Sequence, residues 1–241
     1  LDHFDSLLTP DTALVSIILA NNEIGTIQPL TVISEKAHAV GAIVHSDIVQ
    51  AAGKFKIDLD ALGIDVAVLS SHKCYAPTGC GVLLIRDSGV LKPMLFGGSQ
   101  QQKLRAGTVN AMGLHLFSIG LTYCYNALSQ HLDIHSWAYQ MCETYPFLSL
   151  LLPLSSTSGL WNTVPFIMAD HLAHDAMMRL DMLGVAVSTG SACSTGAVET
   201  SPTIKALGVS DSIANSVVRF SFGYPSTADD LNIITDLFKD F

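Results

Sequence analysis

Residues 13–47 read ALVSIILANNEIGTIQPLTVISEKAHAVGAIVHSD, and this stretch decides the fold. Residues 13–20 are a continuous apolar run, which is typical of a strand covered on both faces. Pro29 is suited to open a helix, and Gly41 stands where a left-handed residue would end it. Residues 43–47 read as a second short strand. The stretch therefore predicts a βαβ unit with parallel strands and a right-handed crossover.

The pattern continues toward the C-terminus with two more short apolar strands, at residues 65–70 and 81–86. A turn bounded by glycine and proline separates them, so we expect two buried strands that flank a tight loop. The alternation of strands and helices predicts an α/β architecture, with ligands at the carboxyl ends of the strands. A change in composition near Ser129 predicts two domains, residues 1–128 and a smaller one over residues 129–241.

A helical pattern follows over residues 109–132. Its apolar and aromatic residues recur at the spacing of one helix face, and we interpret Tyr123 on that face as a packing residue. Cys124 lies in the same apolar surroundings, which favour its burial. The residues of the predicted face are Met112, His115, Leu116, Ile119 and Tyr123.

The composition favours a protein that acts on a small molecule. The chain has 241 residues, 49% of them hydrophobic and 14% charged, so it can bury a large core. A formal net charge of −9 and only 12 scattered lysines and arginines argue against nucleic-acid binding. Five scattered cysteines predict free thiols in a reducing compartment, which fits the cytoplasm. No apolar run approaches the length of a membrane span, so we expect no membrane partner.

Polar side chains follow three of the predicted strands. Asn22 comes after the first strand, Asp47 ends the second, and Lys73 follows the third. The carboxyl ends of parallel strands meet at one edge of a sheet, so we expect these residues to converge on one crevice. A lysine that is partly desolvated at a strand end attacks a carbonyl carbon more readily. From the loop by itself, Lys73 also fits an ordinary surface lysine.

Seven blocks stand in a fixed order along the chain: residues 21–26 (NNEIGT), 45–51 (HSDIVQA), 71–73 (SHK), 97–100 (GGSQ), 105–110 (RAGTVN), 188–194 (STGSACS) and 218–221 (VRFS). Together they resemble the signature blocks of the pyridoxal-phosphate-dependent cysteine desulfurases, which are class V aminotransferases. The most similar branch is that of the nitrogen-fixation and iron–sulfur-cluster enzymes. The resemblance implies part of a type I pyridoxal-phosphate fold, similar to aspartate aminotransferase. It consists of a large domain with a mostly parallel sheet and a smaller C-terminal α+β domain.

The resemblance also implies a cofactor site for pyridoxal 5'-phosphate. Lys73 matches the lysine that forms a Schiff base with the cofactor aldehyde. Asp47 matches the carboxylate that pairs with the pyridine nitrogen and keeps it protonated, so that the ring accepts electrons. The remaining matches are Gln50 to the partner of the ring hydroxyl, Ser70 and His72 to phosphate ligands, and Thr108 to a phosphate ligand from the other subunit of a homodimer.

The same resemblance implies a substrate and a reaction. Asn22 and Arg219 match the pair that binds the substrate carboxylate, for which a guanidinium is geometrically suited. Cys193 matches the nucleophile that takes sulfur from L-cysteine as a persulfide, releasing L-alanine. Members of the family act as sulfurtransferases, and the expected partner is a sulfur acceptor or an iron–sulfur scaffold protein.

Other readings stay open beside this one. Family members carry a long region before the first block, including a phosphate-binding turn and a stacking histidine, so the chain is expected to be N-terminally incomplete. Selenocysteine lyase is one alternative, because it shares the lysine and the cysteine. A non-catalytic remnant or partner-binding module is another. Cys74 departs from the family pattern, and we expect Cys74 and Cys80 to serve in packing rather than to hold a metal.

Overall fold

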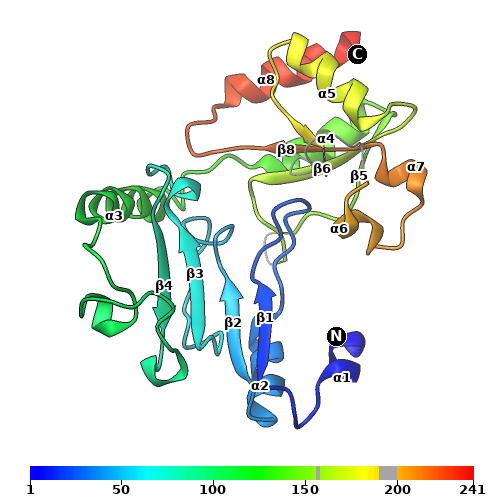
Figure 1. Cartoon of the computed structure of the whole chain (residues 1–241). Helices are drawn as coiled ribbons and strands as arrows, with labels where there is room; N and C mark the ends of the chain where they lie inside the picture. Colours follow the sequence, from blue (N-terminus) through cyan, green and yellow to red (C-terminus); the bar gives the residue numbers. More distant parts are fainter. Residues whose placement is uncertain (156–157, 190–199) are drawn as a thin grey trace. The chain divides into compact units, whose positions relative to one another are not determined.

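The computed structural model describes residues 1–155, 158–189 and 200–241, and it divides into two compact units that are described separately (Figure 1). The first unit consists of Leu1–Leu19 and Gln28–Leu128, and the second consists of Ala20–Ile27 and Ser129–Phe241. The second unit therefore includes a short segment that lies between β1 (Leu14–Ile18) and α2 (Leu30–Ala39) in the sequence. Among the described residues, no helix is both long and apolar enough to cross a membrane.

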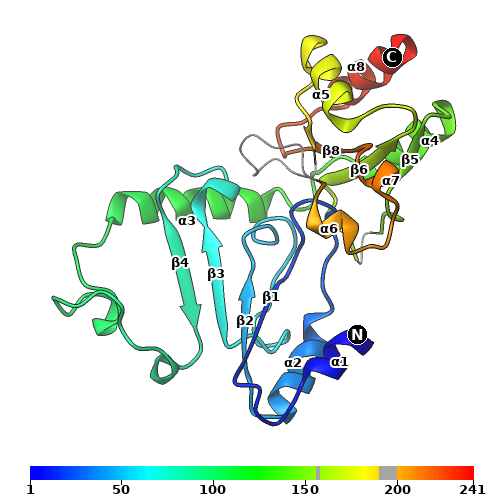
Figure 2. The same cartoon turned by 45° about the vertical axis from the view of Figure 1, so that its right-hand side comes forward.

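The first unit is built on a four-stranded sheet in the order β1-β2-β3-β4, visible in Figures 1 and 2. β1 and β2 are parallel, as are β2 and β3, whereas β4 is antiparallel to β3. The predicted βαβ unit and the α/β class are thus confirmed. The elements are α1 (Asp2–Leu7), β1 (Leu14–Ile18), α2 (Leu30–Ala39), β2 (Ile43–Asp47), β3 (Val66–Ser70), the 3₁₀ helix η1 (Ser71–Lys73), β4 (Gly81–Ile85), η2 (Ser88–Val90), η3 (Gln101–Lys103) and α3 (Ala111–Asn126).

Two strands of this sheet are more exposed than their apolar sequences predict. β1 pairs only with β2 among the described residues, so it forms an edge of the sheet, and Leu14 is 55% exposed. β4 forms the other edge, and both Leu83 and Leu84 are exposed. The prediction that these runs are buried is therefore wrong for the described structure, because an edge strand has a neighbour on one side only.

Helix α3 packs through a face other than the predicted one, with two glycines on it. Gly113, Phe117, Gly120 and Cys124 are its buried residues. A Cβ atom placed on Gly120 would lie 2.2 Å from the carbonyl oxygen of Cys74, so the helix approaches η1 through a position that has no side chain. Met112, Leu116, Ile119 and Tyr123 of the predicted face are exposed instead. The predicted burial of Cys124 is confirmed.

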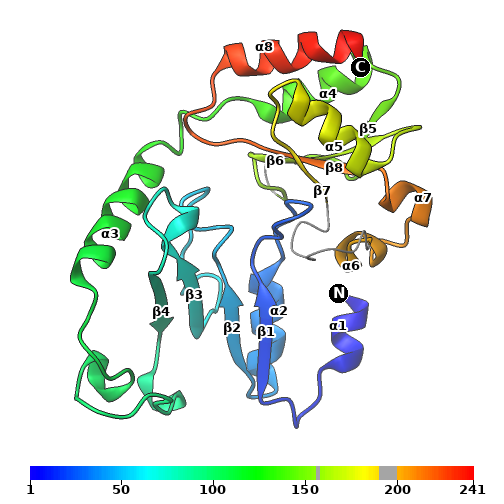
Figure 3. The same ribbon diagram turned by 45° about the horizontal axis from the view of Figure 1, so that its top comes forward.

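The second unit contains an antiparallel sheet in the order β5-β6-β8-β7. Alternate residues of β6 and β8 pack against α4, α5 and α8, and Figure 3 shows α5 and α8 together on one side of the sheet. The opposite face packs against α6, α7 and Ile24. The elements are α4 (Ile134–Thr144), β5 (Leu148–Leu150), β6 (Thr163–Met168), α5 (Ala173–Met182), β7 (Ser188–Thr189), α6 (Pro202–Lys205), α7 (Asp211–Ala214), β8 (Val217–Ser221), α8 (Ala228–Leu237) and the 3₁₀ helix η4 (Phe238–Asp240).

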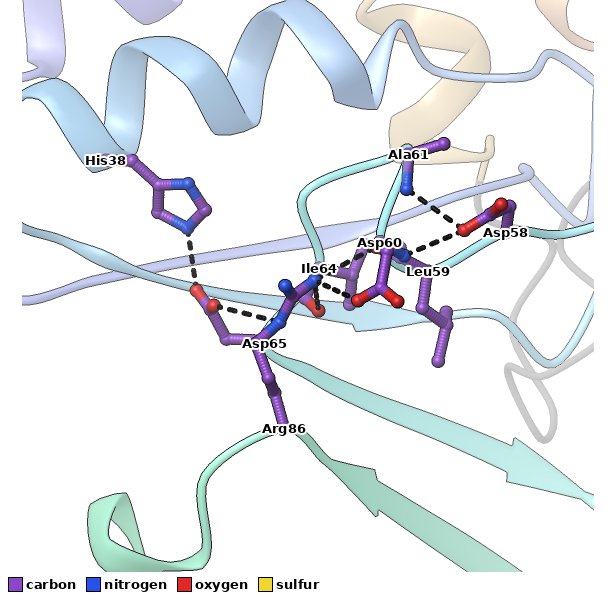
Figure 4. Close-up of polar contacts among 8 residues, drawn as sticks. All are labelled: His38, Asp58, Leu59, Asp60, Ala61, Ile64, Asp65 and Arg86. Atoms are coloured by element: carbon purple, nitrogen blue, oxygen red, sulfur yellow. Dashed lines mark hydrogen bonds and ion pairs between the residues drawn. The ribbon is translucent and has the colours of Figure 1, made fainter.

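A charged cluster in the first unit ties α2 to the amino ends of β2 and β3 (Figure 4). Asp65 Oδ2 accepts hydrogen bonds from His38 Nε2 and from the backbone N–H of Val44, both at 2.8 Å. Arg86 Nη2 lies 3.0 Å from Asp60 Oδ1, and Arg86 Nε lies 3.8 Å from Asp65 Oδ1. These contacts lie at the amino ends of β2 and β3, and the expected site lies at the carboxyl ends. The cluster therefore stabilises the scaffold away from the expected site.

The ionised form of Asp65 stabilises this unit. Burial by itself raises the pKa of Asp65, but the hydrogen bonds from Val44 and His38 and the charges of His38 and Arg86 outweigh it and hold the pKa below its usual value. A carboxyl whose pKa is lowered by folding contributes stability above its unfolded pKa, about 4, and this contribution is lost as pH falls through the folded pKa.

We expect Asp65→Asn to lower the free energy of unfolding by about 1.5–3 kcal/mol at pH 7, the range for hydrogen bonds to charged groups. Urea unfolding at several pH values measures this loss, which should begin to shrink below about pH 4, where the unfolded carboxyl is protonated, and should disappear as pH falls through the lower folded pKa. Asp11→Asn, at an exposed position, is the matched control. Equal stability of the two variants at pH 7 would contradict the assigned role.

Candidate functional site

Two neighbouring strands deliver most of the predicted cofactor residues in the first unit. Asp47 is the last residue of β2, and Ser70 is the last residue of β3. β2 and β3 are parallel, with Asp47 in register with Val68, so both strands end at the same edge of the sheet. Gln50 follows β2. The sheet therefore brings together the carboxylate, the amide and the serine that the sequence placed at strand ends.

Asp47 is held in a fixed orientation with one oxygen left over. Its Oδ1 accepts a hydrogen bond of 2.8 Å from the backbone N–H of Val49. Within the described ranges, Oδ2 has no hydrogen-bond partner. The side chain is only partly buried. This arrangement leaves one carboxylate oxygen able to accept a hydrogen bond from a protonated ring nitrogen.

Gln50 is oriented by Lys54, a residue that the sequence analysis missed. Lys54 Nζ donates to Gln50 Oε1 at 2.9 Å and to the backbone carbonyl of Gln50 at 2.7 Å. An ammonium group only donates, so the bound side-chain atom must be the amide oxygen, and the amide NH₂ remains as a donor. This NH₂ group is able to donate a hydrogen bond to the hydroxyl oxygen on the pyridine ring of the cofactor. The four-residue spacing from Gln50 to Lys54 was the available signal.

Ser70 and His72 form a pair at the start of the lysine turn. Ser70 Oγ lies 2.7 Å from His72 Nδ1. Between them, Ser71 is fully buried, and both its backbone N–H and its hydroxyl contact the carbonyl oxygen of Cys80, at 3.0 and 2.9 Å. Ser71 thus closes the turn and presents its two neighbours. A hydroxyl and an imidazole are suitable ligands for a phosphate group.

Lys73 ends η1 and is exposed. The next residue, Cys74, is 0% exposed, because the short 3₁₀ turn directs Ser71 and Cys74 inward and Lys73 outward. The expected partial desolvation of Lys73 is therefore wrong for the first unit as described. Lys73 Nζ makes no hydrogen bond or ion pair with any described residue, so the amine is available to a ligand.

Two predicted site residues are not placed with the others. Thr108 is exposed in the segment before α3, and its side chain makes no hydrogen bond to the described part of the chain. Its expected role across a subunit interface stays a prediction. Cys193 lies in residues 190–199, outside the described residues.

Asn22 and Arg219 meet in the second unit. Arg219 projects from β8, and its Nη1 donates a hydrogen bond of 2.7 Å to the backbone carbonyl of Asn22. Asn21 fixes the turn, because its Oδ1 accepts the backbone N–H groups of Glu23 and Ile24, at 2.8 and 2.9 Å. The contact uses the Asn22 backbone, so the exposed Asn22 amide is left to face a ligand. The predicted pairing of these two residues thus has a structural basis in this unit.

Glu23 links this turn to α6, which the sequence analysis did not anticipate. Its carboxylate accepts hydrogen bonds from Ser201, the N-cap of α6, and from Thr203, the latter at 3.1 Å. Residues 23 and 201 lie 178 positions apart, so no local pattern could have revealed the contact. Glu23 therefore holds the Asn22 turn against the segment that follows residues 190–199.

The residues of the first unit fit pyridoxal phosphate. They supply a carboxylate for the ring nitrogen, an amide donor for the ring oxygen, two phosphate ligands and an amine for the aldehyde, on two adjacent strand ends and the turn that follows. In the parts of the chain that the structure describes, no group of three or more potential metal ligands gathers.

The model of the family "Aminotransferase class-V" matches residues 1–234. The chain belongs to this family. Class V aminotransferases and the cysteine desulfurases among them depend on pyridoxal phosphate, so the predicted cofactor and the type I fold are confirmed at the level of the family.

Individual class V relatives carry the name of the predicted activity. The chain is 35% identical to "Cysteine desulfurase IscS" of Dictyoglomus turgidum over 243 residues, which covers 99% of the chain and 61% of the relative. It is 34% identical to "Cysteine desulfurase NifS" of Azotobacter vinelandii, covering 96% of the chain and 58% of the relative. The solved NifS-like protein of Rickettsia africae superposes with a TM-score of 0.82 at 26% identity, covering 99% of the chain and 64% of that structure. The chain thus spans about 60% of the length of these relatives.

Proposed function

We propose that this class V protein acts in cysteine desulfuration with bound pyridoxal phosphate. The carboxylate, amide, serine and histidine beside Lys73, at the carboxyl ends of β2 and β3, carry this proposal. The names of the relatives support it. In the reaction, the C–S bond of L-cysteine breaks, the sulfur atom passes to the Cys193 thiol as a persulfide, and L-alanine leaves.

Each residue has a defined role in this proposal. Lys73 would hold the cofactor aldehyde and would move protons at the substrate carbons as a base. When bound, the cofactor supplies an electron sink for the substrate α-carbon. Asp47 would keep the pyridine nitrogen protonated, and Gln50 would donate a hydrogen bond to the hydroxyl group on the ring. Arg219 binds the substrate carboxylate as an ion pair.

The assembly and the partners are part of the same proposal. We infer a homodimer with shared sites, in which Thr108 contributes to the phosphate site of the neighbouring subunit. The persulfide on Cys193 is passed to a sulfur acceptor or an iron–sulfur scaffold protein in the cytoplasm.

The test is Cys193→Ser, assayed for alanine and protein persulfide with L-cysteine and excess pyridoxal phosphate. Alanine formation should fall by roughly 100-fold or more, because the variant lacks the sulfur nucleophile. Cys142→Ser, on α4, is the matched control and should keep its activity. Undiminished alanine formation from L-cysteine by Cys193→Ser would overturn the assigned nucleophile. Turnover of selenocysteine but not of cysteine by the unmodified chain would indicate a lyase.

A further inference from the structure

Two buried cysteines of the first unit lie near each other behind the lysine turn. Cys74 follows Lys73 in the sequence and is 0% exposed, and Cys124 on α3 is 2% exposed. Both sulfur atoms lie close to the backbone of Gly53. Cys74 Sγ also lies 3.6 Å from the carbonyl oxygen of Ala52. Neither thiol has a task in the proposed desulfuration.

The contact depends on two glycines that allow backbone and sulfur to come close. Gly120 lies against the Cys74 carbonyl, and Cys124 follows it by one helical turn on the same face of α3. A Cβ atom placed on Gly53 would lie 3.2 Å from Cys124 Sγ and 3.8 Å from Cys74 Sγ. Both sulfur atoms therefore face the same point of the Gly53 backbone, with no side chain there to separate them.

The surroundings keep the two thiols protonated in the closed structure. Burial, together with the neighbouring Cys124, raises the pKa of Cys74 to about 11, although the Lys54 charge acts in the opposite direction. Burial also raises the pKa of Cys124. A thiolate is the reactive form, so these thiols should react more slowly than an exposed cysteine. Both sulfur atoms lie beside Gly53, so once one of them is oxidised, its partner is nearby.

We propose that Cys74 and Cys124 form an internal disulfide when a hydroperoxide oxidises the protein, and that this bond fixes the lysine turn to α3. One thiolate attacks the peroxide O–O bond, taking up one oxygen as a sulfenic acid and releasing the other as water or an alcohol. The second thiol then attacks the sulfenic sulfur, the S–S bond forms, and water leaves. Both cysteine sulfurs are oxidised by one electron each, and the peroxide is reduced by two.

The bond would place a reversible covalent link next to the proposed cofactor lysine. Cys74 is joined to Lys73 by one peptide bond, so any shift of α3 relative to η1 is then transmitted to the lysine. A dithiol reductant reverses the link by thiol–disulfide exchange. The inference does not depend on the proposed desulfuration, because it concerns the chain itself and is tested without cofactor.

The test treats the purified full chain with hydrogen peroxide, alkylates the remaining thiols in denaturant, and maps the peptides without reduction. We use a Cys193→Ser background, so that a reactive cysteine cannot exchange with the pair. The expected product is a peptide pair linked through Cys74 and Cys124, with a mass lower by two hydrogen atoms and restored by dithiothreitol. Cys142→Ser should leave the link unchanged, and Cys124→Ala should abolish it.

Three results would overturn the proposal. They are a link from Cys74 to Cys80, oxidation of either cysteine without a link, and full alkylation of both thiols after peroxide has oxidised Cys142. The map of the unsubstituted pair decides among these outcomes even where Cys124→Ala fails to fold. As a second measurement, the peroxide-treated chain should melt at a higher temperature than the same sample after dithiothreitol, because a cross-link restricts the unfolded chain.

Discussion

A Lys73→Ala chain is expected to carry no pyridoxal phosphate after reduction with borohydride, whereas the unsubstituted chain carries it at residue 73. The amine of Lys73 stands at the carboxyl end of β3 and makes no ion pair with the described residues. Other lysines are engaged: Lys36 lies 2.6 Å from Asp5, and Lys54 binds Gln50. Since only a free amine near the phosphate ligands can hold the aldehyde in place, the loss should be complete.

The measurement is peptide mapping of the reduced, cofactor-treated protein. Lys56→Ala, at an exposed position in the same unit, is the matched control and should keep the label on Lys73. A label that persists in Lys73→Ala at Lys36, Lys54 or Lys92 would contradict the assignment of Lys73 as the residue that binds the cofactor aldehyde. Because the label is measured without substrate, it separates cofactor attachment from sulfur transfer at Cys193.

The second large effect is expected from Gly120→Ala. A Cβ atom at this position would lie 2.2 Å from the backbone carbonyl of Cys74 and 3.2 Å from Ala76 Cβ. Backbone cannot rotate away as a flexible side chain can, so α3 must move off the lysine turn. We expect the free energy of unfolding to fall by about 1–3 kcal/mol, the cost of overpacking. In an exposed helix the same substitution would stabilise by about 1 kcal/mol.

The opposite signs make this a sharp test by urea unfolding. Ser118→Ala, two residues earlier on the exposed side of α3, is the control and should change stability by no more than about 0.5 kcal/mol. A Gly120→Ala chain as stable as the unsubstituted protein would mean that α3 does not pack on η1 through this glycine. The proposed contact between Cys74 and Cys124 would then lose its basis as well.

Local sequence patterns determined the elements of this protein and the residues at their ends. The apolar run at residues 13–20, the amphipathic stretch after Pro29 and the strand at residues 43–47 predicted the parallel βαβ unit. This worked because periodicity and turn chemistry are local properties of the chain. The same local order placed Asp47, Ser70 and Lys73 at strand ends, and parallel pairing then put the ends of β2 and β3 at one edge.

Only the tertiary structure decided which surfaces face inward and which distant residues touch. The predicted apolar face of α3 is exposed, and the face with Gly113, Phe117, Gly120 and Cys124 is buried, because the close approach to Cys74 leaves no room for a side chain at Gly120. The exposure of Lys73 and the hydrogen bonds from α6 to Glu23 depend on the three-dimensional packing. Residues that touch across long stretches of sequence leave no periodic signal, so the sequence named the chemical groups while the packing determined how they are held.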